Sequence, residues 1–539
     1  MNKSRKALAL VAVVALSLVL CLAAFAALAT CAAAPGRPSI AGAPQEQSPA
    51  KDMKLAPPSP AMAMAAPAAP PPGIAALSAP PAAEVEPPAG VSSEEYKRVE
   101  ENPFKKAAED AVSTFAVDVD TAAYANVRRF LREGRLPERD AVRIEELVNY
   151  FDYGWKEPSG GAPVAITTEA ASCPWAPSHR LVAIGLRTKS VSADNLPPAN
   201  LVFLVDSSGS MSSPDKLPLV KRAFGLLAET LRSQDRVSIV AYAGSAGLVL
   251  PPTPGSDKAS ILAALEELSA GGSTAGGAGI VLAYETALKN FRKGGNNRVI
   301  LATDGDFNVG ASSDEALVDL ITSYRNKGVF LSVLGFGTGN FKDAKMEALA
   351  DKGNGNFGYI DSIGEARKLL VEQMGATLLA VAKDVKVQVE FDKAAVASWR
   401  LIGYENRLLA ARDFADDTKD AGEMGAGHRV TALYEIEPVA GARELGQVRV
   451  RYKKPAEDQS SLIEQPLADG GAGYAAASAD LRFAAAVAAY GMLLRQSPHK
   501  GSADWRMVSE LARPAAAGDS SGRRAEFLEL VDLASKLSK

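Results

Sequence analysis

Short apolar runs alternate with amphipathic segments through the middle of the chain. Leu201–Val205 is uniformly apolar and ends at Asp206, and from Leu217 to Leu231 hydrophobic residues recur at spacings of three and four. The first pattern is typical of a buried strand and the second of a helix with one apolar face. The same alternation predicts strands at 236–242, 248–250, 299–303, 329–335 and 357–360, and helices at 258–268, 277–289, 314–326 and 363–374. We therefore predict an α/β domain with a doubly wound, mostly parallel sheet over residues 199–377.

The patterns on either side of this domain are different. The region 93–198 is predicted to hold a strand at 115–120, helices at 124–131 and 142–151, and strands at 164–168 and 180–187. After residue 382, hydrophobic and polar residues alternate as they do in half-buried antiparallel strands. We predict strands there at 385–391, 401–404, 428–436 and 447–452, followed by helices near 481–494 and 524–536. The expected arrangement is an N-terminal α/β region at 93–198 and a β-rich domain with a helical tail at 378–539, packed together as one companion body.

The N-terminus has the pattern of an export signal. Three basic residues among the first six precede an apolar stretch from Ala7 to Thr30, which is typical of a signal segment. Leu28–Cys31 resembles a bacterial lipobox, so we expect a signal peptide over residues 1–31 with lipidation at Cys31. A plain cleaved signal and an uncleaved transmembrane anchor stay open as alternatives, because the stretch is long enough to span a membrane. All three place the folded part in the bacterial cell envelope, either periplasmic or on the outer surface.

Residues 32–92 are dominated by proline and alanine, and Pro70–Pro72 is one of several proline clusters. A segment of this composition cannot bury a core. We therefore expect a disordered, extended linker that holds the folded part away from a membrane.

Composition excludes several classes of function. The formal net charge of the 539 residues is −4 and the sequence pI is about 5.7, which argues against nucleic-acid binding. Only three histidines occur, and Cys173 is the single cysteine outside the N-terminal apolar segment. This scarcity argues against a zinc enzyme or a Ser-His-Asp hydrolase. A thiol nucleophile at Cys173, six residues before His179, is conceivable, but a structural cysteine is the simpler interpretation.

Candidate chemistry gathers where predicted strands end. Asp206, Ser208 and Ser210 follow one strand directly, Thr274 lies in a glycine-rich loop before a helix, and Asp304 ends another strand. Because the carboxyl ends of parallel strands meet at one edge of a sheet, five oxygen side chains can converge there. Hard oxygen ligands suit Mg²⁺ or Mn²⁺ better than zinc or copper. Three of the five are neutral hydroxyls, and if the two carboxylates act largely through bound water, the ion keeps much of its positive charge. An open coordination position then favours a carboxylate from another protein.

These residues resemble the metal-ion-dependent adhesion site of von Willebrand factor type A (VWA) domains. The similarity extends to bacterial exported VWA proteins of the YfbK type, through Ser113–Thr121, Arg143–Glu146, Asn149–Phe151 and a C-terminal domain of unknown function after about residue 376. It covers roughly residues 93–539. The resemblance implies the VWA fold, Mg²⁺ at the site, and a partner protein whose acidic residue completes the coordination.

Three functions are compatible with such a site. The first is a binding protein that recognises a protein partner through the cation. The second is an envelope scaffold in which the metal only orders the loops, and the third is a Mg²⁺-dependent hydrolase. The motif loops offer no evident catalytic base, so we predict a binding protein and not an enzyme. Helix capping without any metal is the simplest alternative for a serine- and aspartate-rich motif.

Overall fold

The structure is a computed structural model that describes residues 94, 96–273, 276–305, 314–338, 342–373, 375, 379–419, 421–455 and 457–539. They belong to a compact unit that extends from Glu86 to Lys539. The predicted signal peptide, the lipidation site Cys31, the proline-rich linker and the predicted ligand Thr274 lie outside the described residues. Within the described residues, no helix combines the length and the apolar character needed to cross a membrane.

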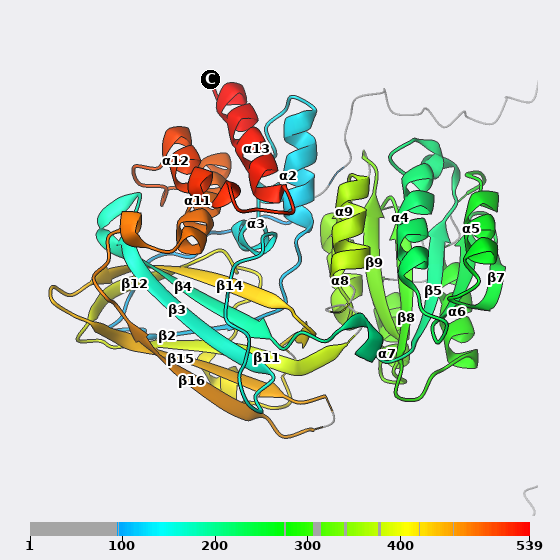
Figure 1. The fold of residues 1–539 in the computed structure, drawn as a ribbon, viewed down its shortest axis with the longest axis horizontal. Coiled ribbons are helices and arrows are strands. Elements are labelled where there is room, and N and C mark those ends of the chain that lie inside the picture. The colour runs from blue at the N-terminus through cyan, green and yellow to red at the C-terminus, as the bar shows by residue number, and fades with distance from the viewer. Residues whose placement is uncertain are drawn as a thin grey trace, which may run out of the picture. The chain divides into compact units, whose positions relative to one another are not determined.

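The central domain is a six-stranded sheet with helices on both faces (Figure 1). Its strand order is β10-β9-β8-β5-β6-β7, and every neighbouring pair is parallel except β6 and β7. The strands are β5 (Ala199–Asp206), β6 (Arg236–Tyr242), β7 (Ala246–Pro254), β8 (Asn296–Thr303), β9 (Phe330–Phe336) and β10 (Phe357–Ile360). The predicted doubly wound, mostly parallel sheet is confirmed.

The helices of this domain divide between two hydrophobic layers. One layer contains α4 (Leu217–Thr230), α5 (Lys258–Glu267), α9 (Ile363–Arg367) and the π-helical turn η4 (Lys368–Glu372). The other contains α6 (Gly276–Lys289), α7 (Asp314–Arg325) and α8 (Asp343–Lys352). Strand β5 lies between them and is buried along its whole length, so it is held rigidly up to its last residue, Asp206.

The companion regions form two antiparallel sheets. One sheet has the order β1-β12-β14-β4-β3, and in the other β13-β11-β15-β16 is joined by β2 on β11. The strands are β1 (Lys105–Lys106), β2 (Val112–Ala116), β3 (Val164–Cys173), β4 (Ala176–Thr188), β11 (Ala380–Phe391), β12 (Val396–Ile402), β13 (Glu423–Gly425), β14 (Arg429–Pro438), β15 (Glu444–Lys453) and β16 (Ser461–Ala468). A hydrophobic core that draws on both sheets holds them together.

Helices from both ends of the described chain cover this β body. They are α2 (Ala122–Arg132), α3 (Ile144–Asn149), α11 (Ala479–Arg495), α12 (Trp505–Ala516) and α13 (Arg523–Leu537). They share one core with buried residues of β3 and β4. Because strands and helices from before and after the central domain interleave, the chain passes out of this body into the central domain and back again.

Several predicted strands have different bounds in the structure, and two of them illustrate the cause. The strand expected at 115–120 ends at Ala116, because the chain turns toward the central domain, where the Phe357 amide donates to Asp120 Oδ1 at 2.9 Å. The strand expected at 248–250 extends over Ala246–Pro254 as the antiparallel edge strand β7. Pairing with β11 therefore limits β2, and pairing with the adjacent strand β6 extends β7.

Candidate metal site

Asp206 lies at the carboxyl end of β5 and is fully buried. The Ser208 amide donates to its Oδ1 at 2.9 Å, and the Tyr242 hydroxyl donates to its Oδ2 at 3.1 Å. The Thr303 hydroxyl lies 3.3 Å from the same Oδ2. Burial raises the pKa of Asp206, the hydrogen bonds from Ser208 oppose that rise, and the nearby charge of Asp304 adds to it. The carboxyl group is therefore fixed in orientation and surrounded by donors.

The two serines of the motif lie side by side, with Ser208 Oγ 3.1 Å from Ser210 Oγ. Ser208 is buried and Ser210 is exposed, so the pair extends from the interior to the surface. Backbone hydrogen bonds tie this loop to the second one: the Gly209 amide donates to Gly272 O at 3.1 Å, and the Gly271 amide donates to Ser207 O at 2.8 Å. The glycine-rich loop therefore reaches the motif within two residues of Thr274.

Asp304 follows β8, the strand that pairs in parallel with β5, and its side chain is fully buried. Its Oδ2 accepts a hydrogen bond from Lys216 Nζ at 2.8 Å. Its Oδ1 is buried and has no hydrogen-bond partner among the described residues. A buried carboxylate oxygen without a partner is costly, so this atom marks a place where a ligand is expected.

Sequence reasoning missed three residues of this site. Tyr242 and Thr303 end the neighbouring strands β6 and β8 and orient Asp206, while Lys216 immediately precedes α4. Lys216 could have been identified in the sequence as a basic residue between the carboxyl end of a strand and the next helix. Tyr242 and Thr303 could have been identified as polar residues at the last positions of strands next to β5.

The chemistry of these side chains fits a hard divalent cation. Two carboxylates, one of which has an unpartnered buried oxygen, and two neighbouring hydroxyls provide oxygen atoms and negative charge, as Mg²⁺ and Mn²⁺ require. Within the described ranges, no three His, Cys, Asp or Glu side chains cluster so as to hold a metal ion. Any cation site at this sheet edge therefore depends on hydroxyl ligands as well as carboxylates.

The other candidate residues have structural environments. Cys173 is buried, and burial raises the pKa of its thiol far above the usual range, which does not favour a nucleophile. The His179 ring is hydrogen-bonded to Glu435, Nδ1 to Oε1, at 2.7 Å. Two acidic residues close in sequence, Asp118 and Asp120, lie 4.0 Å and 3.5 Å from Arg407, so their charges face a cation of the chain itself.

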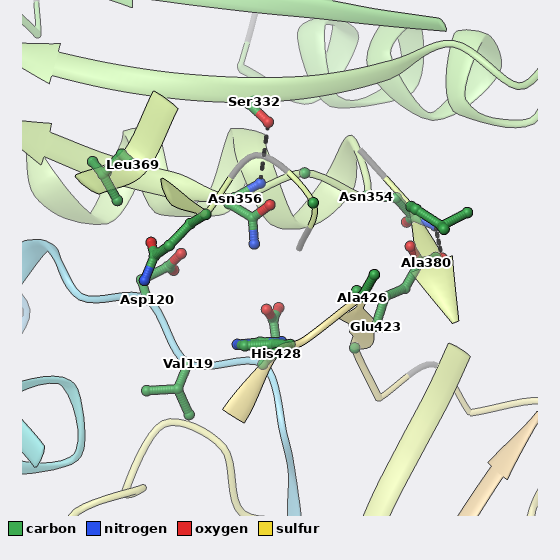
Figure 2. Close-up of a pocket in the computed structure, with 18 of the residues that line it drawn as sticks. Val119, Asp120, Ser332, Asn354, Asn356, Leu369, Ala380, Glu423, Ala426 and His428 are labelled. Atoms are coloured by element: carbon green, nitrogen blue, oxygen red, sulfur yellow. Dashed lines mark hydrogen bonds between the residues drawn. The ribbon is translucent and has the colours of Figure 1, made fainter. Parts of the chain in front are cut away.

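A hollow of about 1200 Å³ lies away from this site, at the amino ends of β8 and β9. Asn356 and His428 point toward one another across it (Figure 2). Several of its polar groups pair with each other: Asn354 donates to Glu423 at 3.3 Å, and the Asn356 amide donates to Ser332 at 3.4 Å. The residues that line the hollow come from segments distant in sequence, so no local sequence pattern could predict it.

Comparison with known proteins identifies the class first. Residues 200–372 match the family described as von Willebrand factor type A domain, and residues 90–183 match one described as von Willebrand factor. Residues 376–537 match the family described as Uncharacterized protein YfbK, C-terminal. The central domain, whose residues 200–372 give this match, is thus a VWA domain.

Whole-chain relatives then give the family. The uncharacterized protein YfbK of Escherichia coli is 43% identical over 466 residues, which cover 81% of this chain and 80% of that protein. An uncharacterized Synechocystis protein is 28% identical, over 54% of this chain and 70% of its own length. The chain belongs to the YfbK family of VWA-domain proteins.

Solved structures that match are more distant. A von Willebrand factor type A protein from Catenulispora acidiphila is 17% identical with a TM-score of 0.38, covering 70% of this chain and 87% of its own. The conserved hypothetical protein BatB from Bacteroides thetaiotaomicron is 23% identical with a TM-score of 0.29, covering 33% and 97%.

Proposed function

We propose that this protein binds a protein partner through a divalent cation at the carboxyl edge of the VWA sheet. Asp206, Ser208, Ser210 and Asp304 would hold Mg²⁺ or Mn²⁺ together with Thr274. The observation that carries the proposal is Asp304 Oδ1, which is buried without a hydrogen-bond partner in the described chain, at the edge where the two serine hydroxyls meet.

The residues have distinct parts in this proposal. Asp206 is buried and oriented by donors from two strands, which suits a fixed anchor for the ion or its water. Ser210 is exposed, so the ion it helps to hold would face outward. A bound divalent ion would supply a coordination position that a carboxylate from outside could fill. The partner expected from this chemistry presents an aspartate or glutamate side chain.

We also infer that the protein is exported and anchored to a membrane of the cell envelope. The anchor would be a lipid on Cys31 or an N-terminal helix, and the Pro/Ala-rich segment would be the tether. The basic and apolar N-terminal pattern supports this. Labelling cells with a radioactive fatty acid tests the lipid, because Cys31→Ala should lose a label that the wild type carries.

A pull-down from envelope extract, with the purified protein as bait, tests the main proposal. Asp206→Ala removes a proposed ligand, and Asp215→Ala is the matched control, because Asp215 lies in the same loop and bonds only to Ser213 among the described hydrogen bonds. We expect a partner that is retained in Mg²⁺ by the wild type and the control, and lost with EDTA or Asp206→Ala. If the partner is still retained in EDTA and by Asp206→Ala, the proposal is contradicted. The metal would then have only a structural role, as in the scaffold alternative.

A further inference from the structure

We propose that Lys216 is a built-in cation that sets the net charge of the metal site. By neutralising part of Asp304, it would loosen the hold on the divalent ion and leave the loaded site positively charged toward one carboxylate. This inference rests on the proposed function. Its basis is the ion pair between Lys216 Nζ and Asp304 Oδ2 at 2.8 Å, in which the lysine side chain is 10% exposed and the aspartate side chain 0%.

The position of Lys216 is fixed by its backbone. Its amide donates to Ser213 O at 3.0 Å, and its carbonyl accepts from the Leu219 and Val220 amides at 2.9 Å each, at the start of α4. An ion pair that begins from a rigid helix start costs less side-chain entropy than one made by a mobile surface lysine. Lys216 is therefore a fixed component of this site.

The side-chain stem is confined as well. It packs against Gly337, which has a positive φ of +74°, and a Cβ there would overlap Lys216 Cγ. The Tyr359 hydroxyl donates to Gly337 O at 2.8 Å and so helps to hold that turn in place. The absence of a side chain at Gly337 leaves the space through which the ammonium group reaches Asp304.

The charges then decide the behaviour of the site. Asp206 and Asp304 together carry two negative charges, and Lys216 reduces this to one. A divalent ion brings the loaded site to one net positive charge, which a single partner carboxylate neutralises. Without Lys216 the loaded site is already neutral, and a partner carboxylate would be an excess negative charge. At short range in a poorly solvated site, one unit of charge changes the electrostatic energy of ion and carboxylate binding strongly.

Two opposite effects of one substitution follow. Lys216→Met keeps the apolar stem and removes the charge. We expect it to bind Mg²⁺ roughly tenfold more tightly than the wild type, because the ion faces two uncompensated carboxylates. In EDTA the variant should unfold at a lower temperature than the wild type, since those carboxylates then repel one another without a counter-ion.

Calorimetric titration of the full chain with MgCl₂ alone, with thermal unfolding in EDTA, tests this inference. Lys221→Met is the control, because Lys221 lies on the same helix but donates to Glu266 O at 2.7 Å, away from the site; it should match the wild type. Lys216→Arg keeps the charge and should stay within a few-fold of the wild type. Equal or weaker Mg²⁺ binding by folded Lys216→Met would overturn the inference while the proposed function stands. A wild type that binds no Mg²⁺ would overturn both.

Acetate is the probe for the carboxylate part. With Mn²⁺ at the site, acetate that takes the open position displaces water and lowers the water-proton relaxation rate. We expect the wild type to need several-fold less acetate than Lys216→Met for the same decrease. Equal acetate dependence in the two proteins would refute the role of Lys216 in partner binding.

Discussion

Asp206 and Asp304 differ in what surrounds them, although both lie at the carboxyl ends of buried parallel strands. Asp206 is saturated by donors from its own loop and from β6 and β8, whereas Asp304 has one oxygen on Lys216 and one without a described partner. The strand-end rule could predict which carboxylates lie at this edge, because it depends only on strand polarity. It could not predict Lys216 or Tyr242, whose roles arise from neighbours across the sheet edge.

His428 should make the stability of the folded protein depend on pH. Burial lowers the pKa of its ring to about 4, and the positive charge of Arg429 adds to this. The folded protein therefore keeps the ring neutral while the unfolded chain protonates near pH 6.5. The stability that His428 contributes is fully present above pH 6.5 and is lost as the pH falls toward 4.

Replacement of the ring by an amide removes this titration. We expect His428→Gln to flatten the fall in unfolding temperature between pH 6.5 and 4, relative to the wild type. His499 lies beside Phe104, and burial lowers the pKa of its ring by a smaller amount. His499→Gln should therefore keep more of the slope. Identical pH profiles for wild type and His428→Gln would show that the ring is not responsible.

The bounds of a helix or strand could be predicted from the local spacing of apolar residues only where a fixed face of that element is buried. Strand β5 and helices α4 and α6 lie where the spacing of apolar residues predicted them, because the sheet and its two layers bury them on fixed faces. Strand β16 and helices α8 and α12 are among the elements that were not predicted. Along β16 exposed and half-buried residues alternate at a sheet edge, so its apolar signal is weak. Pairing with β15 defines it, and that partner cannot be seen in a local window.

The turn between α8 and β10 packs closely against strand β9. Gly355 lies where a Cβ would overlap the Leu331 carbonyl, so the turn packs on the backbone of β9. We expect Gly355→Ala to lower the free energy of unfolding by about 2–3 kcal/mol, because a backbone contact cannot move aside as a side chain can. Urea denaturation measures this. Gly470→Ala is the control, since a Cβ there meets nothing within 4 Å, and equal stability of the two variants would contradict the packing argument.

Three arginines of the companion body reach the VWA domain. Arg128 pairs with Asp361 and Glu365, Arg143 with Asp343 and Glu347, and Arg407 with Glu347, Asp351 and Asp120. Most of their partners lie on α8 and around α9, not at the metal site. The companion body therefore holds the VWA domain through helices on its flank. Among the described residues, none of these three arginines pairs with the loop that carries Ser208 and Ser210. Residue spacing could not reveal these pairs, which join segments about 200 residues apart or more for Arg128 and Arg143.

Removal of one clamp tests the whole-molecule arrangement. Arg407→Ala leaves the buried Asp120 without its arginine and removes one of the two arginine partners of Glu347. We expect it to lower the free energy of unfolding by about 3 kcal/mol. Arg412→Ala is the control, because that side chain is 91% exposed and lies 3.9 Å from Asp413. Chemical denaturation compares the two, and a loss no larger for Arg407→Ala than for Arg412→Ala would show that the clamp contributes little.

The proposed divalent cation at the carboxyl edge of the VWA sheet can be measured by calorimetric titration of the purified full chain with MgCl₂, beside Asp206→Ala. We expect saturable binding of one ion by the wild type and its loss in Asp206→Ala, with both proteins folded by circular dichroism. Absence of binding by the wild type, or equal binding by the variant, would contradict the proposal.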